Sequence, residues 1–367
     1  MPSLFESTNL AGMTLRNRLM RSATWERMAD GQGRLTPRLE RTLLDIAEGG
    51  AALIFPGYAF VTAQEQPNPG MLGIYDDACV PDLERLTEGV HQRGAAIGLQ
   101  LAYGGSFTNY RPEGRLIWGP SAVPHPATEV VPQPMSLGDI QSLVEAFALA
   151  AGRAQRAGFD CVQMHSSHGY LLSQFLSPYF NRREDAYGGS LENRCRIHRE
   201  ILAAIRRETG HSYPVLIKIN SADHMPGGLS AAESLEACRI LDGLGIDGIE
   251  ISGGVRTKDP DTYFVKPHIL KPERQSYYRP YAEAVARAVK APVILVGGNR
   301  DARMLQQMLD TTAIAYFSLS RTLISEPDLV NRWRDDSAHQ PRCRSCNQCF
   351  DPAGHICVLD RKAAQKA

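Results

Sequence analysis

Short apolar runs alternate with longer stretches of helical periodicity along almost the whole chain. The short runs are rich in β-branched residues and are often followed by Gly, Ser, His or Asn, which is typical of buried strands that end in loops. We expect strands at 18–23, 51–57, 96–101, 161–165, 215–220, 248–254, 292–298 and 314–320. We expect helices at 36–48, 79–94, 137–157, 190–208, 230–245, 279–289 and 301–309, with another at 326–334.

This eightfold alternation predicts the fold class, an α/β protein built as a (β/α)8 TIM barrel. The strands of such a barrel are parallel and buried, and the nearly continuous apolar runs VLIKIN and APVILVGG fit that requirement. The rival architecture is a doubly wound open sheet, which normally shows a G-x-G-x-x-G turn after its first strand. Here the first strand leads into SATWERMAD, so the barrel is the better interpretation.

The barrel should form a single domain. We expect it to cover 1–335, with an N-terminal cap, and to be followed by a Cys-rich C-terminal tail over 336–367. The segment 103–136 is rich in Pro, Gly and Tyr and follows the third strand, so it should be a long loop over the barrel mouth. Loops of that length usually have a function.

Charge and composition exclude some classes of partner. The 367 residues have a formal net charge of zero, which removes the electrostatic argument for nucleic acid or an anionic membrane surface. No apolar run approaches the roughly 20 residues of a membrane-spanning helix, and MPSLFESTNL shows no signal-peptide core. Four of the eight cysteines are scattered and four crowd the last 25 positions, which indicates a cytoplasmic protein rather than a disulfide-rich secreted one.

Candidate chemistry lies where the predicted strands end, because the active site of a barrel gathers at the C-terminal ends of its strands. The residues there combine an amide, two imidazoles, two fixed cations and glycines that open the backbone. We expect these positions to line the site: Ser22, Ala23, Thr24, Gly57, Gln100, His165, His168, Lys218, Gly297, Gly298, Ser320 and Arg321.

The ends of the last two strands form the usual phosphate site of such barrels. Gly297 and Gly298 let the backbone approach a phosphate, and Arg321 can bind it through two donors. The plainer alternative is that the two glycines only turn a strand into a loop. With no P-loop and no G-x-G-x-x-G motif, a phosphate here indicates a mononucleotide cofactor or a sugar phosphate.

Lys218 lies inside an apolar strand, so its charge needs a partner. One role for it is Schiff-base formation, as in aldolase barrels, and another is a fixed positive charge beside the N1 and O2 edge of a flavin. A lysine that only extends past the strand end to solvent is the third interpretation.

His165 ends a strand and His168 follows three residues later, so both imidazoles can approach one atom. The two histidines could bind a metal ion, but no acidic third ligand lies near them in the sequence. The plainer alternative is that both are structural residues of the core. Two N–H donors aimed at a carbonyl oxygen would polarise it and stabilise the enolate formed on reduction. Tyr170 could then supply a proton to the α-carbon.

These stretches resemble the Old Yellow Enzyme family of FMN-dependent NAD(P)H oxidoreductases. The likeness runs from about Leu4 to Trp333, and it is carried by H-x-x-H-G-Y-L-L-x-Q-F-L-S-P from His165 and by N-x-R-x-D-x-Y-G-G-S-L-E-N-R up to Arg194. NRLMRSAT, LQL and VGG add weaker support. The resemblance implies an ene-reductase that takes electrons from NADH or NADPH and reduces the C=C bond of an enone or enal. It also implies a homo-oligomer.

The resemblance further implies a role for each matching position. Lys218 would stand beside flavin N1 and O2, where relatives usually have arginine. His165 and His168 would bind the substrate oxygen, and Tyr170 would protonate the α-carbon while hydride passes from flavin N5 to the β-carbon. The remaining cofactor positions would be Ser22, Ala23, Thr24, Gly57 and Gln100 along the flavin, with Gly297, Gly298, Ser320 and Arg321 at the phosphate.

The sequence departs from the family pattern at four positions. Tyr103 stands where the common Q-L-x-H-x-G-R motif has a histidine, and Trp25 stands where many relatives have a small or thiol side chain. We expect both residues to shape the substrate pocket. Gln163 replaces the usual Glu before the histidine pair, and Ser320 replaces the usual Gly at the phosphate.

Cys343, Cys346, Cys349 and Cys357 have the regular spacing of metal ligands. Larger relatives in the 2,4-dienoyl-CoA reductase and trimethylamine dehydrogenase branch have a four-cysteine [4Fe–4S] motif at about this place, with slightly different gaps. Thiolates at this spacing suit an iron–sulfur cluster or zinc, and a tail of ordinary thiols with no metal is the third interpretation.

Three further functions stay open beside the ene-reductase. One is an iron–sulfur flavoprotein reductase fed by a separate electron donor, because the C-terminal flavin and nucleotide domains of those larger relatives are not in this sequence. Another is a lyase on the same barrel that forms a Schiff base through Lys218. A non-catalytic binding or electron-transfer subunit is the third.

Overall fold

The computed structural model describes residues 2–108, 110 and 114–365. Within these residues, eight parallel strands form a closed ring, because β10 pairs with both β7 and β11, and β14 pairs with both β13 and β3. The predicted TIM barrel is confirmed. In ring order the strands are β3 (Leu19–Arg21), β4 (Leu53–Ile54), β7 (Ala96–Ala102), β10 (Cys161–Ser166), β11 (Val215–Asn220), β12 (Gly248–Ser252), β13 (Val293–Leu295) and β14 (Tyr316–Leu319).

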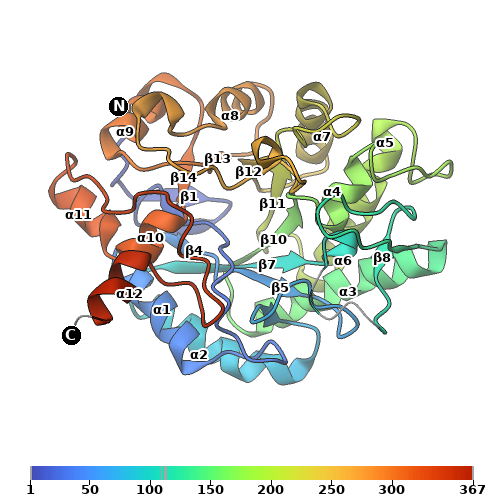
Figure 1. The fold of residues 1–367 in the computed structure, drawn as a ribbon, viewed down its shortest axis with the longest axis horizontal. Coiled ribbons are helices and arrows are strands. Elements are labelled where there is room, and N and C mark those ends of the chain that lie inside the picture. Colours follow the sequence, from blue (N-terminus) through green and yellow to red (C-terminus); the bar gives the residue numbers. More distant parts are fainter. Residues whose placement is uncertain (1, 109, 111–113, 366–367) are drawn as a thin grey trace.

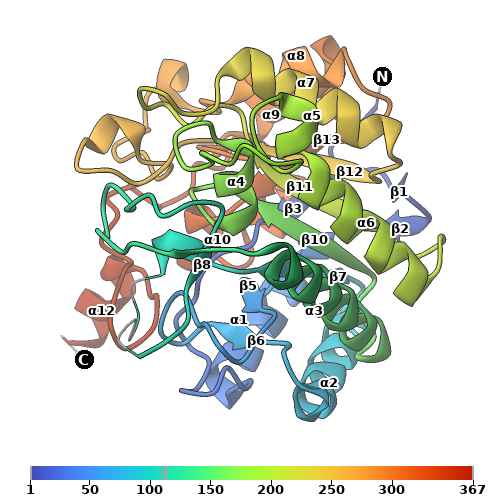
Figure 2. The ribbon, with the colours of Figure 1, turned by 90° about the vertical axis from the view of Figure 1, so that its right-hand side faces the viewer.

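Helices surround this ring, as Figures 1 and 2 show. The larger ones are α1 (Pro37–Glu48), α2 (Val80–His91), α3 (Leu137–Arg156), α6 (Arg196–Thr209), α7 (Ala231–Gly243), α8 (Arg279–Ala286), α9 (Ala302–Thr311) and α11 (Leu329–Asp335). Shorter ones are α4 (Leu171–Leu176), α5 (Leu191–Arg194), α10 (Arg321–Ser325) and α12 (Val358–Ala364). The single helix predicted over 190–208 is divided at Cys195, which ends α5 and precedes α6.

Four 3-10 turns and six short strands complete the described chain. The turns are η1 (Asp77–Cys79), η2 (Gly105–Phe107), η3 (Pro260–Thr262) and η4 (Pro272–Arg274). The strands are β1 (Thr8–Leu10), β2 (Met13–Leu15), β5 (Tyr58–Phe60), β6 (Leu72–Gly73), β8 (Trp118–Gly119) and β9 (Gln133–Pro134). The strand predicted over 51–57 is therefore broken. Gly57, with φ of 97°, separates β4 from β5. β4 pairs with the beginning of β7, and β5 pairs with its end.

The predicted N-terminal cap is the antiparallel hairpin of β1 and β2. Leu10 and Leu15 from this hairpin pack in one buried cluster with Met20, Leu53 and Leu216 from the barrel strands. Burial of this apolar surface closes the N-terminal end of the barrel. The functional site is thus confined to the opposite end, where the strands lead into their loops.

The C-terminal tail packs against the barrel. Arg300 is buried and donates from Nη1 to the carbonyl of Cys343 at 2.9 Å and from Nη2 to the carbonyl of Pro341 at 3.2 Å. The tail therefore belongs to the same compact body as the barrel.

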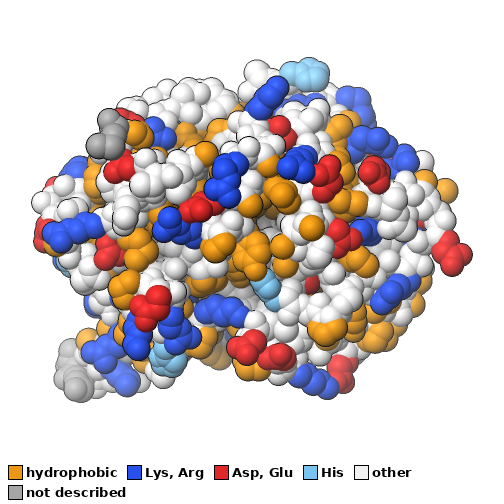
Figure 3. Space-filling view, turned by 90° about the horizontal axis from the view of Figure 1, so that it is seen from above, with side chains coloured by type: hydrophobic (Ala, Val, Ile, Leu, Met, Phe, Trp, Pro, Cys, Tyr) orange, Lys and Arg blue, Asp and Glu red, His pale blue; other side chains and the backbone are white. Residues whose placement is uncertain are grey.

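The surface carries mixed charge. Figure 3 shows Lys and Arg interspersed with Asp and Glu over one face of the molecule. Within the described part of the chain, none of the helices combines the length and the apolar character that crossing a bilayer requires.

Candidate active site

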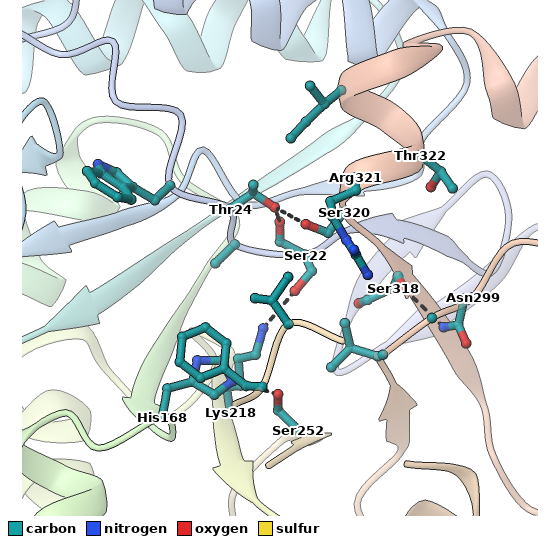
Figure 4. Close-up of a pocket in the computed structure, with 18 of the residues that line it drawn as sticks. Ser22, Thr24, His168, Lys218, Ser252, Asn299, Ser318, Ser320, Arg321 and Thr322 are labelled. Atoms are coloured by element: carbon teal, nitrogen blue, oxygen red, sulfur yellow. Dashed lines mark hydrogen bonds between the residues drawn. The ribbon is translucent and has the colours of Figure 1, made fainter. Parts of the chain in front are cut away.

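An open cavity of about 1250 Å³ lies at the C-terminal end of the barrel. The predicted site residues that line it are Ser22, Ala23, Thr24, Trp25, Gln100, His165, His168, Tyr170, Lys218, Gly297, Gly298, Ser320 and Arg321. These residues come from six barrel strands and their loops, and the closed ring brings their C-terminal ends together. Figure 4 shows several of them converging on one space.

A buried polar chain crosses the floor of this cavity. Gln100 donates to Gln163 at 2.6 Å, and Gln163 donates to Oε2 of Glu250 at 2.9 Å. Ser22 donates to Oε1 of Glu250 at 2.7 Å, and Lys218 donates to Ser22 at 2.7 Å. Each link joins a different pair of strands, so the barrel register fixes the whole chain. Buried polar networks are stable only when their members are satisfied in this way.

Glu250 is the partner that a buried Lys218 requires. The Lys218 Nζ and Glu250 Oε1 atoms are 3.5 Å apart, and both side chains are at most 5% exposed. A carboxylate at this distance holds the lysine as a cation, which suits a fixed charge beside a cofactor better than a nucleophilic amine. Sequence reasoning missed Glu250, although a glutamate inside the apolar strand GIEIS was a signal of the same kind as Lys218.

One end of the cavity fits a phosphate. Gly297 and Gly298 have φ of 105° and 84°, and a Cβ on either would lie 2.5 Å and 2.9 Å from the rings of Tyr278 and Tyr277. Only glycine allows this backbone path, which leaves the two amide groups accessible to a ligand. The guanidinium of Arg321 lines the same space.

Ser320 and Thr24 connect two neighbouring strand ends in the wall of the cavity. Their hydroxyl oxygens are 2.8 Å apart, across β14 and β3, as Figure 4 shows. Asn299 donates to the carbonyl of Ser318 at 3.0 Å and to that of Leu295 at 2.8 Å, which holds the loop after β13. The replacement of the usual Gly by Ser320 thus adds a side-chain contact beside the phosphate end.

The two histidines stand side by side in the cavity wall, with ring centroids 5.5 Å apart. Nδ1 of His165 is 3.1 Å from the hydroxyl of Ser167, and Nε2 of His168 is 2.7 Å from the hydroxyl of Ser252. Burial lowers the pKa of both imidazoles well below the usual range, and the Lys218 charge lowers it further. Both rings are therefore neutral, and each has one N–H to donate.

Tyr170 completes this wall. Its ring centroid is 4.2 Å from that of His165, and its hydroxyl accepts a 2.9 Å hydrogen bond from Asn68. Burial, with a smaller effect of Tyr58, raises the pKa of Tyr170 well above the usual range. The phenol consequently keeps its proton over the working range of pH.

Residues of the tail also reach the cavity. Cys343, Ser345, Cys349, Phe350 and His355 line it. The His355 ring lies edge-on to Trp25, with centroids 4.9 Å apart, and burial lowers the pKa of this imidazole to about 4. Trp25 is in the position expected for it, and a tail residue that no sequence pattern indicated packs beside it.

The four tail cysteines line a second, smaller cavity of about 380 Å³, which also includes Arg321. All four are free thiols. Within the described residues, no three His, Cys, Asp or Glu side chains converge closely enough to hold a single metal ion.

Two predicted site residues lie outside the main cavity. The Tyr103 ring stacks on Trp118 beneath the loop after β7, with centroids 5.7 Å apart, and its hydroxyl accepts from the Trp118 amide at 3.3 Å. Gly57 lies under the Thr24 carbonyl, which a Cβ on this glycine would approach to 3.0 Å. The long loop 103–136 does reach the cavity, through Phe107, whereas its positions 109 and 111–113 lie outside the described residues.

Sequence reasoning missed a further group of cavity residues. Tyr58 begins β5, Asn68 lies in the loop after β5, Ser252 ends β12, and Phe264 stacks on His168 with centroids 4.0 Å apart. Ser252 stood at a predicted strand end and could have been found. Asn68 and Phe264 lie in loops whose path no local pattern determines, and Tyr58 lies in a short strand that the sequence did not predict.

The fold and the site together define the class of protein, which is a barrel oxidoreductase with a binding site for flavin mononucleotide. The sequence matches the family described as NADH:flavin oxidoreductase / NADH oxidase over residues 3–340. The chain belongs to this family and is an FMN-dependent oxidoreductase that uses NAD(P)H. The predicted resemblance to the Old Yellow Enzyme family is confirmed.

Individual relatives agree with this assignment. The chain is 30% identical to a 4,4'-dithiodibutanoate disulfide reductase of Rhodococcus erythropolis, over 98% of this chain and 95% of that one. It is 32% identical to an NADPH dehydrogenase of Geobacillus thermodenitrificans, over 88% of this chain and 91% of that one. Morphinone reductase is similar in structure, with a TM-score of 0.78 and 25% identity over 93% of this chain and 91% of that one. By contrast, the chain spans 55% of a metal reductase of Desulforamulus reducens.

Proposed function

We propose that this enzyme reduces the C=C bond of α,β-unsaturated carbonyl compounds, with an enone or enal as its small-molecule substrate. The observation that carries the proposal is the wall formed by His165, His168 and Tyr170, where two neutral imidazoles and one neutral phenol face a single cavity. Two donors for an oxygen and one proton source beside them are what addition of hydrogen across an enone requires.

In this proposal His165 and His168 donate to the carbonyl oxygen of the substrate and stabilise the negative charge that develops on it. Ser167 and Ser252 hold the two rings in place through their contacts at 3.1 Å and 2.7 Å. Hydride adds to the β-carbon, and Tyr170 gives its hydroxyl proton to the α-carbon. The phenolate left on Tyr170 then takes a proton from water, which restores the residue.

The residues that would hold FMN are those of the cavity floor and the glycine end. Ser22, Ala23, Thr24, Gln100 and Lys218 would lie along the ring. Gly297, Gly298, Ser320 and Arg321 would hold the phosphate. Bound FMN supplies the electron chemistry, accepting hydride from NAD(P)H and passing it to the substrate. The protein supplies position and charge, above all the Lys218 cation that Glu250 and Ser22 fix in place.

We also propose that Cys343, Cys346, Cys349 and Cys357 hold an iron–sulfur cluster. One zinc ion draws its sulfur ligands to about 2.3 Å from one point, whereas a [4Fe–4S] cube keeps its four cysteines farther apart. The proposal is supported by the regular spacing of the four cysteines and by the single cavity that all four line. A bound cluster would carry single electrons, which favours an iron–sulfur reductase fed by a separate electron donor as the second candidate function.

The cluster has its own test. A Cys346→Ser variant should lose iron, acid-labile sulfide and the brown absorbance that underlies the flavin bands. Cys238→Ser is the matched control, because Cys238 is a buried thiol of α7 outside both cavities. Iron content that is unchanged in Cys346→Ser would remove these cysteines from a metal site.

A cytoplasmic location is supported by the free, buried thiols of Cys79, Cys161, Cys195 and Cys238. Such thiols are typical of a reducing compartment. A homo-oligomer is expected from the family resemblance alone.

The ene-reductase proposal is tested by Tyr170→Phe. The visible spectrum of the wild-type holoenzyme should first show bound flavin. In stopped flow, flavin reduction by NADPH should be nearly unchanged in the variant, while reoxidation by cyclohexenone should slow by about 100-fold or more. Reoxidation by ferricyanide, which needs no proton on carbon, is the control. Equal rates of cyclohexenone reduction in the two proteins would overturn the proposal.

A further inference from the structure

Asn68 lies between the two phenols of the cavity wall. Its Nδ2 atom is 2.9 Å from the hydroxyl of Tyr170 and 3.0 Å from the hydroxyl of Tyr58. All three side chains are at most 9% exposed, and all three line the main cavity. The two phenol rings meet at 65° with centroids 5.4 Å apart, so the amide nitrogen occupies the point where their hydroxyl groups approach each other.

The direction of these hydrogen bonds follows from the chemistry of an amide. The nitrogen of Asn68 has two hydrogens and no lone pair to offer, so it can only donate. Each phenol oxygen therefore accepts one hydrogen from Asn68. The two hydroxyl groups also hydrogen-bond to each other, so one of the two hydroxyl hydrogens remains for another acceptor. The cavity is the space that Tyr58 and Tyr170 share, and a substrate is the acceptor that enters it.

The loop that carries Asn68 is held at two points. The indole of Trp25 donates to the carbonyl of Pro69 at 2.9 Å, and the amide of Ala29 donates to the carbonyl of Gly70 at 3.0 Å. Gly70 has φ of 63°, and a Cβ there would lie 2.8 Å from the backbone of Arg27. This close approach holds the loop against the segment after β3, so the position of the amide is determined by the fold rather than by the ligand.

We infer that Asn68 is a positioning residue that holds the hydrogen-bonded phenols Tyr170 and Tyr58 so that a hydroxyl proton of the pair is directed into the active-site cavity, toward the substrate. The inference rests on the proposed role of Tyr170 as proton donor and adds the group that orients its proton. Tyr58 becomes the second hydroxyl group of this hydrogen-bonded pair. Trp25 acts on the same wall indirectly, by holding the Asn68 loop.

The test compares Asn68→Asp with Asn68→Leu in the FMN-loaded enzyme. An ionised aspartate only accepts, so it should take the phenol proton of Tyr170 and slow reoxidation by cyclohexenone by about tenfold to hundredfold. When the aspartate is protonated at lower pH it can donate again. The ratio of the Asn68→Asp rate to the wild-type rate should therefore rise as the pH falls from about 8 to about 5. Asn68→Leu should show a smaller loss without this pH dependence.

Flavin reduction by NADPH and reoxidation by ferricyanide should keep their wild-type rates in both variants. Asn331→Asp is the matched control, because Asn331 also donates from its amide, to the carbonyl of Glu48, far from the cavity. A cyclohexenone rate in Asn68→Asp that equals wild type, or that is reduced equally at every pH, overturns the inference. The proposed function fails separately, if Tyr170→Phe has no effect on cyclohexenone reduction.

Discussion

Lys218 and Glu250 stand opposite each other in the parallel register of β11 and β12, with Nζ and Oε1 3.5 Å apart. The pair lies in the barrel interior, directly under the cavity. Its position gives the lysine of an apolar strand a buried counter-charge, and Ser22 bridges the two groups from the end of a third strand.

Removal of one member of this pair should be costly. Lys218→Met leaves the Glu250 carboxylate buried without its counter-charge, and breaking a buried pair in this way typically costs about 3–5 kcal/mol. The double variant Lys218→Met/Glu250→Gln should lose much less, because no unpaired charge remains. Urea unfolding of the flavin-free proteins measures the free energy of unfolding of the single and the double variant. A single variant as stable as the double variant would show that the two groups do not interact.

The paired imidazoles should control the binding of phenol ligands. His165→Ala removes one of the two donors and should weaken the affinity for p-hydroxybenzaldehyde by about tenfold to hundredfold, with loss of its charge-transfer band. His198→Ala is the control, since His198 is buried against Ser166 and does not line the cavity. Titration of each variant with p-hydroxybenzaldehyde, at the same flavin content, gives the two dissociation constants. An unchanged affinity in His165→Ala would contradict the assigned role.

Glu65 should make stability depend on pH. Burial raises the pKa of this carboxyl to about 8 in the folded chain, against 4.5 in the unfolded chain. The folded state thus holds a proton that the unfolded state has released, and the corresponding stability is lost as the pH rises from about 4.5 to 8. Each pH unit in that window costs about 1.4 kcal/mol.

Glu65→Gln removes the titrating proton and keeps an oxygen that can accept from the Gly104 amide, as Glu65 does at 3.1 Å. Its free energy of unfolding should fall less between pH 5 and pH 8 than that of the wild type. Parallel curves of stability against pH for the two proteins would mean that Glu65 ionises normally.

Arg321 should contribute to cofactor affinity through its charge. Arg321→Gln removes a cation from the glycine end of the cavity and should raise the Kd of FMN by about tenfold or more, with a smaller change for riboflavin, which has no phosphate. Arg332→Gln is the control, because Arg332 is half exposed in a surface ion pair with Asp328. Equal loss of affinity for FMN and riboflavin would place Arg321 away from the phosphate.

The barrel and most of its floor could be predicted from the amino-acid sequence. Parallel strands buried on both faces need continuous apolar runs, so their order and number can be read directly, and the barrel rule then places Gln100, His165 and Lys218 at one end. The bounds and continuity of several elements were wrong in detail, as at the strand predicted over 51–57 and the helix predicted over 190–208. The strand predicted over 292–298 ends at Leu295, because Gly297 and Gly298 leave the ladder with positive φ to form the ligand loop.

The side chains that meet across the barrel, and the loops that cover it, could not be predicted, because they depend on contacts between distant parts of the chain. Glu250 pairs with Lys218 because two strands share a register, and Asn68 reaches Tyr170 across 102 residues of chain. His355 reaches Trp25 because the tail folds back over the cavity. Loops and tails carry no periodic pattern, since their paths are set by contacts distant in sequence rather than by local hydrogen bonding. For the same reason Tyr103, although next to a predicted strand end, packs on Trp118 instead of facing the cavity.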